Sequence, residues 1–225
     1  MKPLLITIDG PAGAGKTTVS KLLAQRLGYT YVDTGALYRA IAYAAHSAKI
    51  GADDDTALQK LCATLNLKLE RNNDNVRLLL NGRDITGLIR TPEITMLASA
   101  VSARPVVREY LLDLQRALGH DRRAVFEGRD MGTVVFPDAD VKFYLDASPK
   151  VRAYRRYLEL KSKSRQTLGE VEGELERRDR NDSSRQTAPL RPAPDAIRID
   201  ATDLSAEQVV ETMLDRVDEL AAAEK

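Results

Sequence analysis

The stretch GPAGAGKT at residues 10–17 decides how this chain is interpreted. It follows an apolar run, LLITI at 4–8, and precedes a segment whose apolar residues recur at helical spacing. Gly10 and Gly15, followed by Lys16 and Thr17, have the spacing of a phosphate-binding loop. A strand, a glycine-rich loop and a helix in this order are the context in which that motif is meaningful, so a chance glycine turn is the weaker explanation.

The chemistry of such a loop predicts a nucleoside triphosphate ligand. Glycines allow the backbone to curl so that successive N–H groups point at an anion, and the following helix adds its positive dipole end. Lys16 is expected to reach the outer phosphates, and the hydroxyl of Thr17 is expected to bind Mg²⁺. The predicted triphosphate-binding residues are Gly10, Pro11, Ala12, Gly13, Ala14, Gly15, Lys16, Thr17 and Thr18.

The composition excludes several other kinds of protein. With 225 residues, 43% of them hydrophobic and 30% charged, the chain is expected to be globular with a substantial core. A net charge of +1 gives no general basic field for nucleic acid or membrane surfaces. One cysteine and two histidines argue against a disulfide framework and a zinc site. With no signal peptide and no long apolar run, the chain is predicted to be cytoplasmic.

The rest of the chain alternates between strand and helix patterns. Strands are expected at 4–8, 29–32, 124–126, 141–145 and 196–199, with helices between them, which predicts an α/β fold with a parallel sheet. The helix after the loop is expected to end near Gly28, and Ser148-Pro149 is expected to cap the helix after 141–145. Residues 66–90 break this rhythm with an antiparallel meander that turns around residues 72–75 and again at an Asn81-Gly82 hairpin turn. The polar, glycine-punctuated segment 161–173 is predicted to be mobile.

Two other motifs point to different chemistry, and neither fits its context. The Asp-x-x-Gly at 84–87 lies in the antiparallel insert, and the guanine-reading Asn-Lys-x-Asp of switch GTPases does not occur. The Asp-Thr-Gly at 33–35 resembles an aspartic protease triplet, but that chemistry needs two such carboxylates sharing a proton. Asp33 has two open interpretations, as an organiser of Mg²⁺ or Arg39 and as a helix N-cap.

Several arginines are placed where a second anion could bind. Arg39 lies one helical turn after Gly35, and Arg129 ends a core strand at the sheet edge where parallel sheets bind ligands. A further group shares one helix face through its i, i+4, i+7 spacing: Arg178, Asp182 and Arg185. A solvated face with local ion pairs is the alternative for this group. Two phosphates repel each other, so phosphoryl transfer needs such donors, together with a lid that excludes water.

At this point the chain resembles the bacterial-type cytidylate kinases, which are nucleoside monophosphate kinases. The resemblance covers nearly the whole length. Its motifs are ITIDGPAGAGKTT at 6–18, DTGALYR at 33–39, IRTPE at 89–93, VREYLL at 107–112, EGRDMGTVVFPDA at 127–139, KFYLDAS at 142–148 and RRDRNDSSR at 177–185. The GRDMGTVVFPDA stretch and the RDxxDSxR pattern are far more specific than the phosphate loop.

The resemblance implies transfer of the γ-phosphoryl group of ATP to CMP or dCMP with Mg²⁺, catalysed with Lys16, Arg129 and Arg185. It implies that Thr34, Arg39, Arg129 and Arg185 hold the acceptor phosphate, that Ser99, Arg108 and Asp130 read cytosine, and that Arg178 and Asp182 meet the ribose. ATP contacts from Arg152, Arg155 or Arg156 are left open, because 161–173 shows little resemblance. Thr34 stands where many relatives have Ser, and it keeps the hydroxyl.

The implied fold is an adenylate-kinase-like P-loop core with three α/β/α layers. The core would span 1–62, 103–155 and 187–225, with a monophosphate-binding insert at about 63–102 and a helical lid at about 156–186. The family also implies a monomer whose partners are ATP and CMP or dCMP. Two alternatives remain at this stage: a kinase of the same core for UMP or a metabolite hydroxyl, and a nucleotide sensor that transfers nothing.

Overall fold

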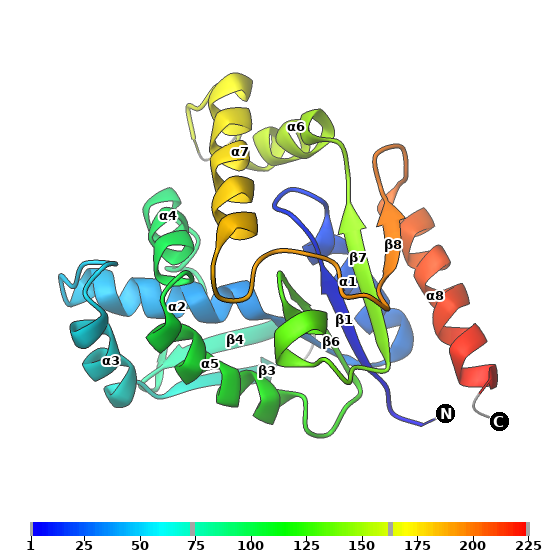
Figure 1. Cartoon of the computed structure of the whole chain (residues 1–225), viewed down its shortest axis with the longest axis horizontal. Coiled ribbons are helices and arrows are strands. Elements are labelled where there is room, and N and C mark those ends of the chain that lie inside the picture. Colours follow the sequence, from blue (N-terminus) through cyan, green and yellow to red (C-terminus); the bar gives the residue numbers. More distant parts are fainter. Residues whose placement is uncertain (1, 73–74, 162–163, 224–225) are drawn as a thin grey trace. The chain divides into compact units, whose positions relative to one another are not determined.

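The structure is a computed structural model that describes residues 2–72, 75–161 and 164–223 (Figure 1). The chain divides into two compact units. The first unit comprises Met1–Asp33 and Leu118–Lys225, and the second comprises Thr34–Ala117. The predicted core, insert and lid have other bounds and remain a prediction about substrate binding.

The first unit contains the phosphate loop and a parallel sheet. Its elements are β1 (Leu5–Asp9), α1 (Lys16–Leu27), β2 (Thr30–Asp33), β6 (Ala124–Gly128), the π-helix η1 (Met131–Val135), β7 (Val141–Asp146), α6 (Pro149–Leu160), α7 (Leu168–Ser184), β8 (Ile197–Asp200) and α8 (Ala206–Ala223). The five strands lie in the order β2-β6-β1-β7-β8, and all neighbours are parallel. The predicted α/β fold class is confirmed.

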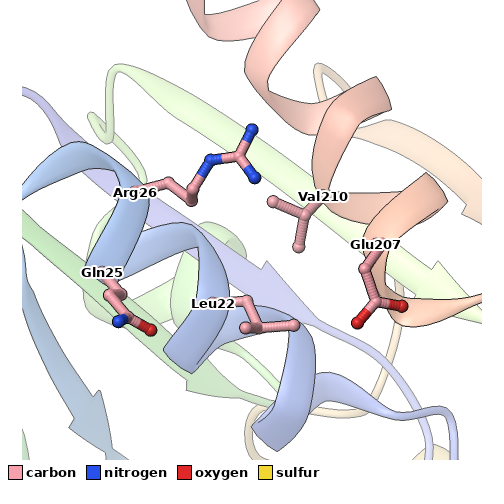
Figure 2. A pocket seen from close by; sticks show the side chains of 5 residues that line it. All are labelled: Leu22, Gln25, Arg26, Glu207 and Val210. Atoms are coloured by element: carbon pink, nitrogen blue, oxygen red, sulfur yellow. The ribbon is translucent and has the colours of Figure 1, made fainter.

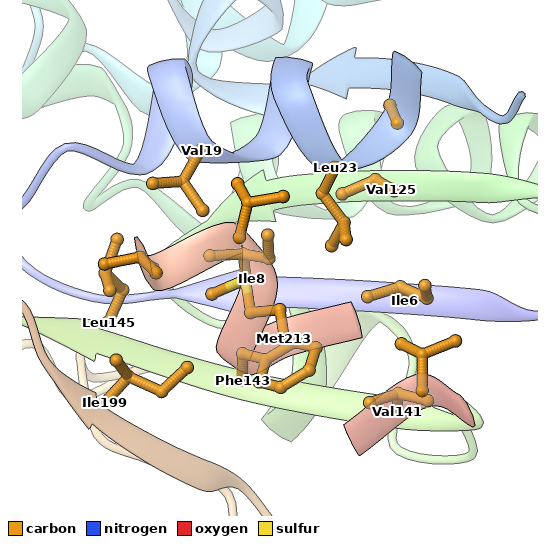
Figure 3. Close-up of a cluster of buried hydrophobic side chains, with 14 of the residues drawn as sticks. Ile6, Ile8, Val19, Leu23, Val125, Val141, Phe143, Leu145, Ile199 and Met213 are labelled. Atoms are coloured by element: carbon orange, nitrogen blue, oxygen red, sulfur yellow. The ribbon is translucent and has the colours of Figure 1, made fainter. Parts of the chain in front are cut away.

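Strand β1 is central in this sheet because its sequence, LITID, is buried along its whole length. Its apolar side chains meet those of β7, α1 and α8 in one core (Figure 3). Ile6 and Ile8 are fully buried there, as are Leu23 of α1 and Met213 of α8. At about 25 cal/mol per Å² of buried apolar area, a core of this kind holds the loop that follows β1 on a rigid base.

Local sequence signals set the ends of several helices. Gly28 ends α1 in the left-handed conformation, as the sequence predicts. Pro149 begins α6 after Ser148, although the Ser148 side chain makes no capping bond, so this part of the capping prediction is wrong. Thr167 and Glu170 form a capping box that starts α7 inside the predicted mobile segment, of which residues 162–163 lie outside the described part.

The second unit contains the antiparallel insert and four helices. Its elements are α2 (Thr34–Ser47), α3 (Asp55–Thr64), β3 (Leu67–Asn72), β4 (Asn75–Leu80), β5 (Arg83–Asp84), α4 (Pro92–Val101) and α5 (Pro105–Leu118). The strands form a sheet in the order β3-β4-β5 with antiparallel pairing, which confirms the predicted meander. Asn81 and Gly82 both have positive φ, as the predicted hairpin turn requires. The turn predicted around residues 72–75 includes 73–74, which lie outside the described residues.

Among the described residues, no helix combines the length and the apolar composition that crossing a membrane requires.

Candidate active site

The phosphate loop joins β1 to α1, and its glycines are required by the space around them. Gly10 has φ +148°, and a Cβ there would lie 1.9 Å from the carbonyl oxygen of Leu145 on β7. Gly13 has φ +78°, and a Cβ there would lie 2.8 Å from the carbonyl oxygen of Arg152. The loop therefore lies against the end of β7 and the start of α6, where only glycine allows this approach.

Lys16 is the first residue of α1 and is buried. Its ammonium group donates a hydrogen bond of 2.6 Å to the carbonyl oxygen of Pro11, within the loop itself. Burial lowers the pKa of Lys16, and the positive charge of Arg129 lowers it further. A bound phosphate would stabilise the charged form of Lys16, because it would place a negative charge beside this buried ammonium group.

Glu127 is a site residue that the sequence analysis did not assign. It lies near the end of β6, and its Oε1 accepts a 2.8 Å hydrogen bond from the hydroxyl of Thr17, 110 residues earlier. Burial raises the pKa of the Glu127 carboxyl, and the neighbouring charge of Asp33 raises it as well. A carboxylate beside the predicted Mg²⁺ ligand offers the hard oxygen that this ion prefers. The sequence does place Glu127 at the end of a predicted core strand. It does not show that this strand end lies beside Thr17.

Asp33 ends β2, level in the sheet with Glu127, and α2 begins at the next residue. Asp33 is buried, and its charge acts on Glu127. Asp33 therefore lies beside Glu127 and directly before a helix, so its position is compatible with both interpretations, as an organiser of Mg²⁺ and as a helix N-cap. The described residues hold no group of three or more His, Cys, Asp or Glu side chains that could bind a metal by themselves. Mg²⁺ bound by one or two protein oxygens and by substrate phosphates needs no such group.

A second charged group links the end of β6 to α7. Nε of Arg129 donates a 3.0 Å hydrogen bond to Oδ2 of Asp182, and Nη2 of Arg185 lies 3.2 Å from Oδ1 of the same carboxylate. Asp182 and the Arg185 side chain are both largely buried. Burial alone would raise the pKa of Asp182, but the guanidinium groups of Arg129, Arg185 and Arg178 bring it below its usual value. The predicted helix face is therefore an organised cationic group, and the solvated-face alternative is wrong for it.

Asp130 follows Arg129 and is buried. Its carbonyl oxygen accepts the N–H groups of Val134 and Val135 at 2.9 and 3.2 Å, which opens the π-helix η1. Such helices are rare and occur often at functional sites. The sequence analysis expected no helix in this stretch.

The three arginines of α6 whose ATP contacts were left open have different partners. Arg152 is buried and donates to the carbonyl oxygens of Ala147 and, inside the loop, Ala12, at 2.9 and 3.1 Å. Arg155 donates to the carbonyl oxygen of Ala201 at 2.7 Å, after β8. Arg156 forms an ion pair with Glu159 on its own helix. Of the three, Arg152 is the one that holds the loop backbone.

The remaining predicted CMP residues belong to the second unit. Thr34 begins α2 and is buried, and Arg39 lies on the same helix. Ser99 is on α4, where its carbonyl oxygen accepts a hydrogen bond from Ser102. Arg108, on α5, is buried, donates a 3.0 Å bond to the carbonyl oxygen of Ser102, and has its guanidinium 5.5 Å from the centre of the Tyr38 ring.

A surface hollow of about 450 Å³ lies elsewhere in the first unit, between α1 and α8. Figure 2 shows its lining, which comes from Leu22, Gln25, Arg26, Glu207 and Val210. The exposed Arg26–Glu211 ion pair, at 2.7 Å, bridges the same two helices. None of these residues belongs to the phosphate loop or the Arg129 group, so the hollow is not part of the candidate site.

Comparisons with known proteins identify the family of the chain. The family model described as cytidylate kinase matches residues 6–219. A cytidylate kinase of Geobacter sulfurreducens is 54% identical and covers 93% of this chain and 91% of its own length. One of Syntrophotalea carbinolica is 51% identical, with 97% and 93% covered.

Solved structures support the fold alone. A gluconokinase of Sinorhizobium meliloti aligns with a TM-score of 0.51 at 14% identity, over 100% of this chain and 98% of its own. A shikimate kinase of Acinetobacter baumannii gives a TM-score of 0.50 at 14% identity, with 96% and 94% covered. Because the family model and close relatives span almost the whole sequence, the chain belongs to the cytidylate kinase family.

Proposed function

We propose that this protein transfers the γ-phosphoryl group of ATP to CMP or dCMP, giving ADP and CDP or dCDP. The observation that carries the proposal is that one unit contains two separate groups with the chemistry to bind an anion. The phosphate loop is the first, and the group of Arg129, Asp182 and Arg185 is the second. A protein that only binds ATP has no use for the second group, whereas a kinase with a phosphate acceptor requires it.

In this proposal Lys16 bridges the donor and acceptor phosphates, and Arg129 and Arg185 neutralise the acceptor phosphate and the charge that spreads over the transferred group. Arginines in this role are worth roughly 10³–10⁵ in rate. Asp182 holds both guanidinium groups, so less entropy is lost when substrate arrives. No strong general base is needed, because positioning and electrostatics carry most of this chemistry.

The residues fit Mg²⁺, which would be held by the oxygens of Thr17 and Glu127 with the triphosphate. When bound, the ion supplies positive charge between the outer phosphates and orients them for transfer. The hydrogen bond from Thr17 to Glu127 keeps the two oxygens together before that, at 2.8 Å. The charges of Lys16 and Arg129 and the hydrogen bond from Thr17 favour the ionised form of Glu127, whereas burial and the charge of Asp33 oppose it.

Cytosine recognition is assigned to Asp130 with Ser99 and Arg108. Cytosine offers an amino donor at N4 and acceptors at N3 and O2, and a carboxylate suits the donor. Uracil has an acceptor at that position, so Asp130 would face a carbonyl group and discriminate against it. Thr34 and Arg39 as phosphate ligands, and Arg178 and Asp182 as ribose ligands, belong to the same proposal.

The test is a panel of acceptors with ATP and Mg²⁺, in which ADP release is measured for CMP, dCMP, UMP and AMP. We expect CMP or dCMP to have the highest kcat/KM, by about 10² or more over UMP if the polar discrimination acts as described. Equal use of UMP would contradict the role of Asp130, and ATP hydrolysis without acceptor phosphorylation would contradict the kinase proposal.

We also propose that the protein acts in the cytoplasm as a monomer, with ATP and CMP or dCMP as its partners. Light scattering during size-exclusion chromatography tests the oligomeric state. A mass of twice the 24.9 kDa of the chain would contradict it.

A further inference from the structure

Asp9 is a buried carboxylate that the phosphate-transfer scheme does not use. It ends β1, directly before the loop glycine Gly10. Its Oδ1 accepts the backbone N–H of Met131 at 2.9 Å, and its Oδ2 accepts the backbone N–H of Gly132 at 2.8 Å. Because both oxygens are engaged by two successive amides, the bond fixes the orientation of the backbone as well as its position.

The two amides belong to the start of η1, where N–H groups have no partner within the helix. Arg129 and Asp130 immediately precede them, so the carboxylate of Asp9 holds the turn that presents both side chains. The turn lies close to β1, since a Cβ on Gly132 would be 3.1 Å from Oγ1 of Thr7. Strand β1 thus supports the donor loop with its backbone and the Arg129–Asp130 turn with one side chain.

Burial disfavours the ionised form of the Asp9 carboxyl. Burial, with a smaller contribution from the Asp130 carboxylate, raises its pKa to about 6, although the amides of Gly132 and Met131 and the charge of Lys16 act to lower it. A carboxylate kept ionised at neutral pH in a buried position, facing a specific backbone segment, is typical of functional sites.

We infer that Asp9 is a positioning residue for the acceptor nucleotide, which fixes the Asp130–Gly132 turn against the strand that carries the donor loop. The inference rests on the proposed roles of Arg129 and Asp130. In this inference β1 aligns the acceptor nucleotide with the donor. A displaced Asp130–Gly132 turn would move the Asp130 carboxylate, whereas the phosphate loop would keep its conformation.

The principal variant is Asp9→Asn. An asparagine has one carbonyl oxygen and one amino group at this position, so one of the two amides would face a donor and lose its partner. We expect the KM for CMP to rise about tenfold or more, as for a lost hydrogen bond to a charged group, with the KM for ATP changed by about twofold or less. Hydrogen exchange at the Met131 and Gly132 amides should accelerate as well.

A second variant displaces the turn without touching Asp9. In Gly132→Ala the added methyl group would lie 3.1 Å from Oγ1 of Thr7 and 3.2 Å from Cδ of Lys142, so either the turn or these side chains must move by a few tenths of an ångström. We expect the same selective rise in the KM for CMP. This variant keeps the inference testable if Asp9→Asn does not fold.

The matched control is Asp140→Asn. Oδ2 of Asp140 also accepts a backbone N–H of β1, that of Leu5 at 2.6 Å, but at the opposite end of the strand. We expect a lower melting temperature for this variant and an unchanged ratio of the two KM values. Equal effects of Asp9→Asn on both KM values, or no effect on either, would overturn the inference.

Asp130→Ala, measured in the same assay, separates this inference from the proposed function. If Asp130→Ala raises the KM for CMP and neither Asp9→Asn nor Gly132→Ala does, the inference about Asp9 fails and the proposed function stands. If Asp130→Ala leaves CMP use unchanged, the cytosine-reading role fails, and the inference built on it fails too.

Discussion

In the proposed function, the phosphate loop and the Arg129 group bind the same kind of ligand, a phosphate, by different means. The loop uses consecutive residues, 10–17, and recognises an anion mainly with backbone N–H groups and one lysine. The Arg129 group uses side chains: Arg129 follows β6, Asp182 lies 53 residues later on α7, and Arg185 directly follows that helix. Backbone recognition needs only a local conformation. Side-chain recognition depends on how distant elements meet, so the two halves of the site have different sensitivity to mutation.

The largest expected effect is at the loop. Lys16→Met should lower kcat by about 10³-fold, because the group expected to bridge donor and acceptor is removed. Steady-state kinetics with saturating ATP and CMP measure this. Lys142→Met is the control, a buried lysine that instead donates to Asp195 at 2.8 Å. If the control loses as much activity at equal folded fraction, general destabilisation and not loss of the phosphate contact is responsible.

Arg129→Ala tests the second anion group. We expect kcat to fall by about 10²–10³-fold and the KM for CMP to rise, with a smaller change in the KM for ATP. The control is Arg122→Ala, which removes an arginine paired with Asp140, away from the group. A loss confined to the KM for ATP would break the division between donor and acceptor groups.

The pH dependence of stability tests Asp9, which directly precedes the loop in the sequence and accepts hydrogen bonds from the turn that follows Arg129. Its folded-state pKa of about 6 exceeds its ordinary 3.8, so its contribution is fully present below pH 3.8 and is lost as pH rises through about 6. This difference between the folded and the ordinary pKa corresponds to ~3 kcal/mol in the free energy of unfolding. In thermal melts from pH 4.5 to pH 8, the stability of the wild type relative to Asp9→Asn should fall with rising pH and level off above pH 7. A difference in stability between the two proteins that stays constant from pH 4.5 to pH 8 would mean that the pKa of Asp9 is not raised in the folded state.

The smallest expected effect concerns the metal. Glu127→Gln keeps an oxygen beside Thr17 but removes the charge, so the Mg²⁺ concentration for half-maximal activity should rise by about tenfold. A Mg²⁺ titration at fixed ATP and CMP measures it, with Glu211→Gln in an exposed ion pair as control. An unchanged Mg²⁺ requirement would exclude Glu127 from the donor side of the site.

The parts of the site that the sequence predicted correctly are those built by neighbours in the chain. The loop glycines, the end of α1 at Gly28 and the Asn81-Gly82 turn each follow from a local backbone requirement. The spacing of Arg178, Asp182 and Arg185 also predicted a shared face, although the sequence could not tell whether that face met solvent or Arg129. The sequence did not predict the contacts of Glu127 and Asp9, because their hydrogen-bond partners are more than 100 residues away. It did not predict the π-helix either, because the first amides of that helix bond to Asp9.

By itself, the sequence determined that this protein alternates strands and helices around a glycine-rich loop, and it predicted a triphosphate ligand for that loop, because glycine conformation and apolar periodicity act over a few residues. Only the tertiary structure decided that β6 lies beside β1 in the order β2-β6-β1-β7-β8. That order places the carboxylate of Glu127 on Thr17 and the turn after Arg129 on Asp9. The physical reason is that strand pairing is set by the packing of the whole core, whereas the positive φ angles of the loop glycines are a property of the local backbone.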